Sequence, residues 1–142
     1  MNNITTTPMN NISTTPNATP LKGKHILLVE DNELNRLMAA TVLNNYGASV
    51  SEVVNGLEAV AAVRDHSCDL ILMDIQMPLM DGREATRAIR NDIDKEIPII
   101  ALTANANKVE MDFCLAAGMN DYVTKPFKEE HLINVICRWL CI

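Results

Sequence analysis

The feature that most restricts the fold of this chain is a fivefold alternation of short apolar runs with longer amphipathic segments. The apolar runs cover residues 25–29, 48–53, 70–73, 98–102 and 121–124, and the amphipathic segments cover 34–46, 57–65, 83–90, 108–117 and 129–140. Strands that alternate with helices of this length are typical of a parallel sheet with helices on both faces. The pattern therefore predicts an α/β fold of the (βα)5 type, a doubly wound, five-stranded parallel sheet.

The polarity of the runs indicates where each strand lies in that sheet. The first, third and fourth runs contain ILLV, LILM and IIAL, which are wholly apolar, as expected of strands that are covered on both faces. The second run includes Ser49, Ser51 and Glu52, so it suits an edge. In a strand order of 2-1-3-4-5, the third strand is central.

Residues 1–20 differ in composition from the rest of the chain. They carry no charge, are mostly Asn, Thr, Ser and Pro, and contain the duplicated octapeptide MNNITTTP and MNNISTTP. So few apolar side chains cannot offset the entropy that is lost when a chain becomes ordered. We therefore expect residues 1–20 to form a disordered tail or linker and residues 21–142 to form one folded domain.

Charge and cysteine content argue against several classes of protein. The 12 basic and 18 acidic residues give a net charge of −6, which disfavours binding to nucleic acid. No apolar run is long enough to cross a bilayer, and the N-terminus lacks the features of a signal peptide. The four cysteines have no C-x-x-C spacing, which favours reduced thiols over disulfides or a zinc site. We expect a cytoplasmic domain that contacts neither nucleic acid nor membrane.

Polar side chains directly follow four of the apolar runs. Glu30 and Asp31 follow the first, Asp74 the third, Thr103 the fourth, and Lys125 the DYVT segment. Because the carboxyl ends of parallel strands share one edge of the sheet, where ligands bind, these side chains should converge. Three neighbouring carboxylates repel one another, and Mg²⁺ would relieve that repulsion. A carboxylate nucleophile, a metal and a lysine are together suited to phosphoryl transfer onto Asp74.

Four segments, VEDNELNR, LILMDIQMPLMDG, ALTANA and DYVTKPF, resemble the motifs of the response-regulator receiver family in order and spacing. The resemblance covers roughly residues 24–140 and implies the flavodoxin-like, or CheY-like, fold with strand order 2-1-3-4-5. It implies that Asp74 is the phosphorylated aspartate and that Thr103 and Lys125 bind the phosphoryl oxygens. The implied Mg²⁺ ligands are Asp31, Asp74, Glu30 (partly through water) and the backbone carbonyl of Gln76.

The resemblance also implies a switch and a set of partners. Tyr122 would reorient together with Thr103, and the peptide bond between Lys125 and Pro126 would be cis. VEDN combined with MDIQMPLMDG is most similar to receivers of hybrid histidine kinases in phosphorelays. The implied phosphodonor is therefore a histidine kinase or a histidine phosphotransfer domain. An effector or a second copy would contact the face formed by residues 108–117, 121–124 and 129–140.

Two expectations concern helix caps. Asp81 precedes Gly82 and is expected to cap a helix rather than to bind metal. Lys128 stands where a Ser or Asp often caps the last helix of the family, so the family's side-chain cap is not expected there.

Three alternative functions differ in how well the sequence supports them. A haloacid-dehalogenase-type phosphatase needs a second aspartate two residues after the nucleophile, where this chain has Gln76. A nucleotide-binding module needs a glycine-rich loop after the first strand, and this chain has EDNE there. A pseudo-receiver that docks without phosphorylation is the remaining alternative.

Any catalysis would be limited to the domain's own phosphorylation and dephosphorylation, without independent kinase activity. Two arrangements stay open, a stand-alone regulator and the receiver of a hybrid kinase.

Overall fold

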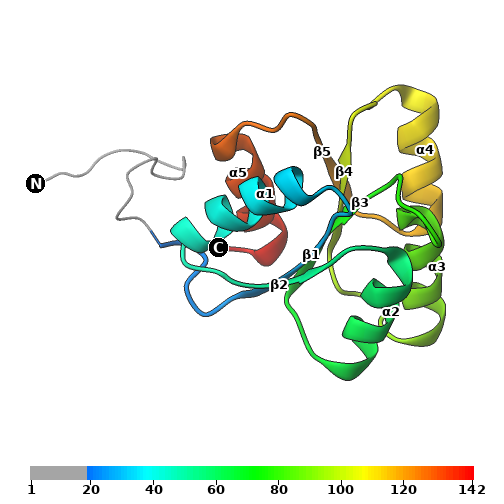
Figure 1. Ribbon diagram of the computed structural model, residues 1–142, viewed down its shortest axis with the longest axis horizontal. Coiled ribbons are helices and arrows are strands. Elements are labelled where there is room, and N and C mark those ends of the chain that lie inside the picture. Colours follow the sequence, from blue (N-terminus) through cyan, green and yellow to red (C-terminus); the bar gives the residue numbers. More distant parts are fainter. Residues whose placement is uncertain (1–18) are drawn as a thin grey trace, which may run out of the picture.

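The computed structural model describes residues 19–142, and five parallel strands form its centre (Figure 1). They are β1 His25–Val29, β2 Ser49–Val53, β3 Leu70–Asp74, β4 Ile99–Thr103 and β5 Asp121–Thr124. The strand order is β2-β1-β3-β4-β5, so β3 is central and β2 is an edge. The predicted fold class and strand order are confirmed. The predicted tail, residues 1–20, lies outside the described residues except for its last two positions.

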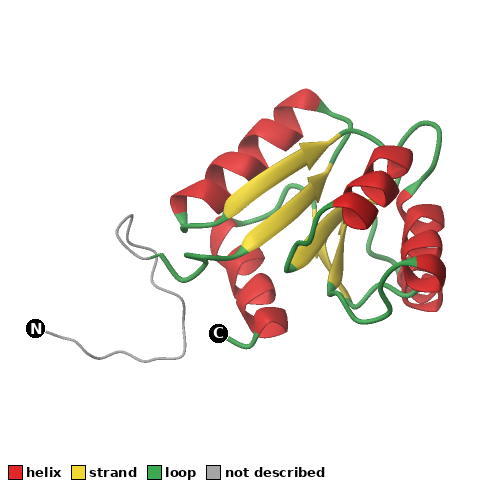
Figure 2. Cartoon of the chain, turned by 90° about the horizontal axis from the view of Figure 1, so that it is seen from below, coloured by secondary structure: helices red, strands yellow, loops and turns green. Residues whose placement is uncertain are grey.

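Helices cover both faces of the sheet, as Figure 2 shows. They are α1 Glu33–Asn45, α2 Gly56–Asp65, α3 Gly82–Asp92, α4 Lys108–Ala117 and α5 Glu129–Leu140. One hydrophobic core contains buried residues of α1 and α5, and the other contains buried residues of α2, α3 and α4. The ends of the elements differ from the predicted ones by at most two residues, because capping side chains fix helix ends more closely than hydrophobic periodicity does.

The alternation of side chains along the strands divides the apolar residues between these two cores. In β1, Ile26 and Leu28 face the core of α1 and α5, while Leu27 and Val29 face the other core. All five residues of β3 are buried. Each large aliphatic side chain that is buried in this way stabilises the fold by about 1.5–3 kcal/mol. The central strand is thus held on both faces, which fixes the position of its carboxyl end.

The helix caps agree with both expectations. The Asp81 side chain caps α3 in a capping box, in which Glu84 N–H donates to Asp81 and Asp81 N–H donates to the Glu84 carboxylate. Lys128 occupies the N-cap position of α5 without a side-chain cap hydrogen bond. Asp81 therefore stabilises the first turn of α3, and α5 is held by packing of its apolar face rather than by a capped start.

The four cysteines differ in burial: Cys114 and Cys137 are buried, Cys68 is partly buried and Cys141 is exposed. All four cysteines are free. Burial raises the pKa of the Cys114 and Cys137 thiols, and raises the pKa of Cys68 to about 11, which favours the protonated thiol over the nucleophilic thiolate. Among residues 19–142, none of the helices combines the length and the apolar character that a bilayer crossing requires.

Candidate functional site

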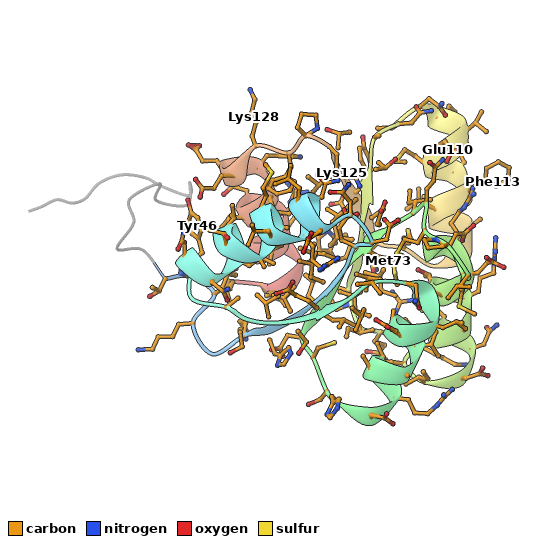
Figure 3. All side chains as sticks on the ribbon, in the orientation of Figure 1. Tyr46, Met73, Glu110, Phe113, Lys125 and Lys128 are labelled. Atoms are coloured by element: carbon orange, nitrogen blue, oxygen red, sulfur yellow. The ribbon has the colours of Figure 1, made fainter. Side chains whose placement is uncertain are left out.

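The carboxyl ends of four strands bring the predicted site residues to one edge of the sheet. Asp74 and Thr103 are the last residues of β3 and β4, Glu30 follows β1, and Lys125 follows β5. Lys125 N–H donates to the Thr103 carbonyl at 2.8 Å, which fixes the start of the β5–α5 loop beside β4. The Lys125–Pro126 peptide bond is cis. Figure 3 shows Lys125 at this edge, between the α1–α5 layer and α4.

Three carboxylates meet at this edge. Ligand oxygens of Glu30, Asp31 and Asp74 all lie within 4.8 Å of one another. Glu30 and Asp74 are only 1% and 5% exposed, whereas Asp31 is exposed. Burial, and then the hydrogen bond and charge of Glu30, raise the pKa of Asp74 to about 7. A hard divalent cation would favour the ionised carboxylates, and an oxygen-only donor set of this kind fits Mg²⁺.

Lys125 supplies the positive charge of the site. Its Nζ lies 3.1 Å from Glu30 Oε1 and 3.3 Å from Asp74 Oδ1. Burial opposes the charged form of Lys125, but the two carboxylates outweigh that effect and raise the pKa of this lysine. Lys125 is therefore cationic at neutral pH and bridges the two buried carboxylates.

Backbone contacts hold Glu30 in place. Its N–H donates to the Val53 carbonyl at 3.1 Å, and its carbonyl accepts a hydrogen bond from the Arg36 guanidinium at 2.9 Å. Its second carboxylate oxygen accepts from Asn32 N–H at 3.2 Å. Asn32 in turn caps α1 through Asn35 N–H. The start of α1 and the position of Glu30 are thus fixed by the same short segment.

A cavity of about 190 Å³ opens beside Asp74. Its lining consists of residues from the ends of β3, β4 and β5 and from the start of α4: Asp74, Ile75, Gln76, Thr103, Ala104, Asn105, Glu110 and Lys125. Thr103 Oγ1 donates to the Asn105 carbonyl at 2.9 Å and accepts from Asn105 N–H at 3.0 Å. The cavity therefore places a carboxylate, a hydroxyl and an ammonium around one space that is open to a small tetrahedral anion.

Gly82 allows α3 to approach the end of the central strand. Its N–H donates to the Ile75 carbonyl at 2.7 Å. A Cβ atom at this position would overlap the carbonyl oxygen of Asp74 and would lie 3.0 Å from Ile75 Cα. Any larger residue must therefore displace the backbone that carries Asp74. This role of Gly82 was not predicted from the sequence.

Tyr122 lies near the site but does not line the cavity. In the register of β4 and β5 it pairs with Ala101, and Thr103 is two residues further along β4. Tyr122 and Thr103 therefore lie on the same face of the sheet, which is the face that α4 covers. Tyr122 is 41% exposed.

Glu110 is a cavity residue that the sequence analysis missed. It lies in the first turn of α4, where its N–H donates at 2.9 Å to the side chain of Asn107, the N-cap residue. The spacing Asn107-x-x-Glu110 is that of an N-cap residue and the third residue of a helix. A helix that follows a parallel strand begins at the carboxyl edge of the sheet. The spacing Asn107-x-x-Glu110 therefore indicates that Glu110 lies at this edge.

The comparisons with known proteins agree with this fold and site. The family model that describes the response regulator receiver domain matches residues 26–137. The receiver domain of sensor histidine kinase PA1611 from Pseudomonas aeruginosa PAO1, solved with magnesium coordinated in the active site cleft, is 44% identical to this chain. Its TM-score is 0.80, and the match covers 84% of this chain and 99% of that one.

Two further relatives point to the same family. A chain in the co-crystal structure of the Saccharomyces cerevisiae histidine phosphotransfer protein Ypd1 and the receiver domain of Ssk1 is 32% identical, with a TM-score of 0.79, and the match covers 85% of this chain and 91% of that one. The sensor protein GacS of Pseudomonas syringae pv. syringae is 44% identical over 122 residues. This match covers 83% of the present chain but only 14% of GacS, so the chain spans a small part of that relative's length. The chain therefore belongs to the response regulator receiver family and is a receiver domain of the two-component and phosphorelay type.

Proposed function

We propose that this domain accepts a phosphoryl group on Asp74 from a phosphohistidine of a histidine kinase or a histidine phosphotransfer domain. The observation that carries the proposal is the position of Asp74. It is a buried carboxylate at the end of the central strand, beside a cavity, with Lys125 Nζ 3.3 Å from its Oδ1 and two more carboxylates next to it. An aspartate in these surroundings is placed to act as a nucleophile toward phosphorus.

In the proposed reaction the P–N bond of the phosphohistidine breaks and a P–O bond to Asp74 forms. The donor imidazole keeps the electron pair of the broken bond and takes up a proton from solvent. Lys125 and the Thr103 hydroxyl bind the phosphoryl oxygens, so that charge which develops on them in the transition state is stabilised by groups already in position.

Magnesium is the proposed cofactor. Glu30, Asp31, Asp74 and the backbone carbonyl of Gln76 would hold it, and when bound it neutralises charge on the phosphoryl oxygens. The three convergent carboxylates support this assignment, as does the magnesium ion reported for the PA1611 receiver domain.

The proposed partner is a protein that carries the donor histidine. The co-crystal structure of Ypd1 and the receiver domain of Ssk1 supports this proposal, because it contains a receiver domain bound to a histidine phosphotransfer protein. We further propose that residues 21–142 form the functional unit, that residues 1–20 act as a linker, and that the domain works in the cytoplasm.

Magnesium is expected to stabilise the protein, and beryllofluoride, an analogue of the phosphoryl group, is expected to add to that effect. A ligand at a hundred times its dissociation constant stabilises the native state by about 2.7 kcal/mol, which corresponds to a rise of several degrees in melting temperature. The measurement is thermal unfolding with magnesium alone and with magnesium plus beryllofluoride. A pseudo-receiver would not respond to beryllofluoride.

Asp31→Ala is expected to remove most of the rise in melting temperature caused by magnesium, because it deletes one of the three carboxylates assigned to the metal. Asp31 is the exposed member of that cluster. The matched control is Asp65→Ala, an exposed carboxylate at the end of α2, which leads to the opposite edge of the sheet. This control should respond like the wild type. Equal responses of both variants would contradict the assignment of the metal site.

We also propose that phosphorylation changes the face formed by α4, β5 and α5 through Thr103 and Tyr122. When Thr103 Oγ1 turns to the phosphoryl oxygen it must leave Asn105, and Tyr122 on the same face can then move inward from its 41% exposed position. The larger apolar contact of Tyr122 would favour that state.

Amide NMR shifts with and without beryllofluoride are expected to change in α4 and around Tyr122, as well as in the loops that touch Asp74. Thr103→Ala should reduce the distant changes, because it removes the hydroxyl that links the phosphoryl group to β4. Changes confined to the loops around Asp74 would mean that partners recognise the new charge itself rather than an altered surface.

A further inference from the structure

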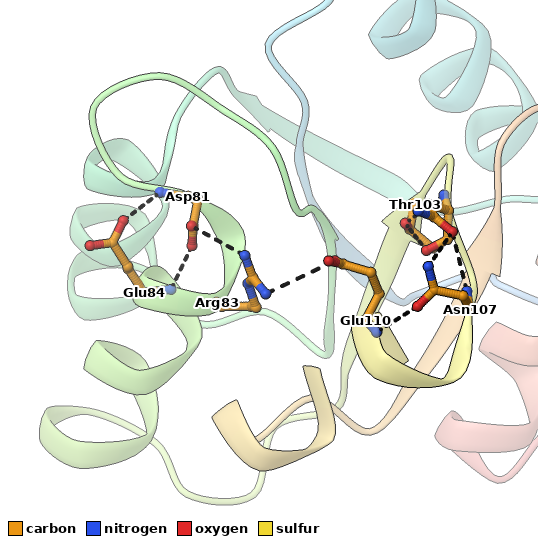
Figure 4. Close-up of polar contacts among 7 residues, drawn as sticks. Asp81, Arg83, Glu84, Thr103, Asn107 and Glu110 are labelled. Carbon is orange, nitrogen blue, oxygen red and sulfur yellow. Dashed lines mark hydrogen bonds and ion pairs between the residues drawn. The ribbon is translucent and has the colours of Figure 1, made fainter. Parts of the chain in front are cut away.

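Glu110 is an acidic side chain at the cavity whose role the proposed function does not use. It reaches the site from α4, whereas the three metal-binding carboxylates come from the ends of β1 and β3. Its side chain is 30% exposed, and its Oε2 lies 3.9 Å from Arg83 Nη1 on α3. Figure 4 shows the Glu110 side chain extending from the first turn of α4 toward Arg83.

The charge of Glu110 is only partly compensated. Arg83 is shared, because its Nη2 also lies 3.9 Å from Asp81 Oδ2. The guanidinium carbon of Arg83 lies 5.8 Å from the centre of the Phe113 ring, which positions the arginine between α3 and α4. Both ion pairs are long, and one cation serves two carboxylates. The group Asp81–Arg83–Glu110 therefore has a net negative charge beside the cavity.

Hydrogen bonds fix Glu110 relative to Thr103. Glu110 N–H donates to the Asn107 side chain at 2.9 Å, and the Asn107 side-chain amide donates to Asn105 Oδ1 at 3.0 Å. Asn105 N–H donates to Thr103 Oγ1 at 3.0 Å. Figure 4 follows this series from Thr103 to Glu110. The backbone of Glu110 is thus held at a constant position next to the hydroxyl that we assign to phosphoryl binding.

We propose that Glu110 is a specificity-determining residue that disfavours small dianionic phosphodonors at Asp74. The inference rests on the proposed function, because it concerns the choice of donor at the same site. A free dianion that enters the cavity must approach Glu110, and repulsion at a partly buried site is weakly screened. Arg83 moderates the repulsion, so its removal should strengthen the discrimination.

The test compares two small donors that differ in charge. Acetyl phosphate is a dianion at neutral pH, and it phosphorylates Asp74 when its acyl P–O bond breaks and acetate leaves with the electron pair. Phosphoramidate is a monoanion, and it reacts when its P–N bond breaks and ammonia leaves after protonation of the nitrogen. In both reactions the new bond joins phosphorus to an Asp74 oxygen. Rates are measured by intact mass at fixed magnesium and low ionic strength.

Glu110→Gln is expected to accelerate phosphorylation by acetyl phosphate about three- to tenfold, as estimated for one charge near a dianion in a medium of intermediate dielectric constant. The gain with phosphoramidate should be smaller, and both gains should shrink at high salt. Arg83→Gln should slow the reaction with acetyl phosphate, because it removes the cation that offsets part of the Glu110 charge. The double variant should react at a rate between those of the two single variants, because the two charges have opposite effects on the dianion.

Asp112→Asn is the matched control. Asp112 lies on the same helix and loses the same charge, but its side chain is 61% exposed, pairs with Lys108 at 3.0 Å and is not among the cavity residues. Its rates should equal those of the wild type. The capping bond of Glu110 involves only its backbone N–H, so Glu110→Gln should preserve α4.

The outcomes separate this inference from the proposed function. If the wild type gains no phosphoryl group from either small donor or from a phosphorylated histidine phosphotransfer protein, the proposed function fails. If the wild type is phosphorylated but Glu110→Gln behaves like Asp112→Asn, the role of Glu110 is overturned. Equal acceleration with both donors would also overturn it, because a structural effect would not depend on donor charge. Arg83→Gln provides an independent measurement, and an unchanged rate there would contradict the role of Arg83.

Discussion

Asp74→Asn is expected to abolish phosphorylation. With acetyl phosphate and magnesium, the wild type should gain one phosphoryl group by intact mass spectrometry, and the variant should gain none. An amide lacks the anionic oxygen that attacks phosphorus. The fold should persist, because the surroundings of Asp74 raise the pKa of its carboxyl to about 7, so they accommodate a neutral side chain.

Asp81→Asn is the control for this experiment. Asp81 lies on the same loop, between β3 and α3, and its function in the structure is to cap α3. Because asparagine is an equally good N-cap residue, this variant should fold and should still gain one phosphoryl group. A stable phosphoryl group on the Asp74→Asn variant, or loss of phosphorylation in the control, would contradict the assignment of the acceptor.

Gly82→Ala is expected to lower the free energy of unfolding, because the added methyl group has no space. Its Cβ would overlap the Asp74 carbonyl oxygen, and both are backbone positions that cannot rotate away. Overpacking of this kind costs about 3 kcal/mol. Urea unfolding should show this loss as a lower midpoint. Phosphorylation of the folded fraction should also slow, because relief of the overlap displaces the end of β3.

Gly23→Ala separates the overlap from the general cost of replacing a glycine. Gly23 has a φ of +82°, but a Cβ there would have nothing within 4 Å. The expected loss is about 1–2 kcal/mol, from the left-handed backbone alone, with an unchanged rate of phosphorylation. If Gly82→Ala cost no more than this control, the close approach of α3 to Asp74 would not be important for stability.

The elements and the main site residues were predictable because their signals are local in the sequence. Burial of β3 on both faces requires an unbroken apolar run, and LILM provides it. Asp74 and Thr103 were predicted to follow strands, and they are in fact the last residues of β3 and β4. The reason is that Asp74 pairs with Leu102, so the ladder extends one residue beyond the apolar run. Backbone pairing does not require an apolar side chain, and hydropathy therefore underestimates strand length.

The contact between Arg83 and Glu110 and the requirement for glycine at position 82 could not be predicted from the sequence. Nothing in the spacing of Arg83 and Glu110 indicates a contact, because their 3.9 Å approach depends on how α3 packs against α4. The need for glycine at position 82 depends on the distance between the start of α3 and the end of β3. Both are properties of packing between elements that are distant along the chain.

The sequence by itself determined the (βα)5 fold, the central position of β3 and the convergence of Glu30, Asp31, Asp74, Thr103 and Lys125 on one edge. These follow from periodicity and from the shared direction of parallel strands. The tertiary structure alone decided how deeply Glu30 and Asp74 are buried, that Lys125 bridges them, and that Glu110 faces the same cavity. Burial and charge pairing arise from distances of a few ångströms between separate elements, and a one-dimensional pattern does not contain those distances.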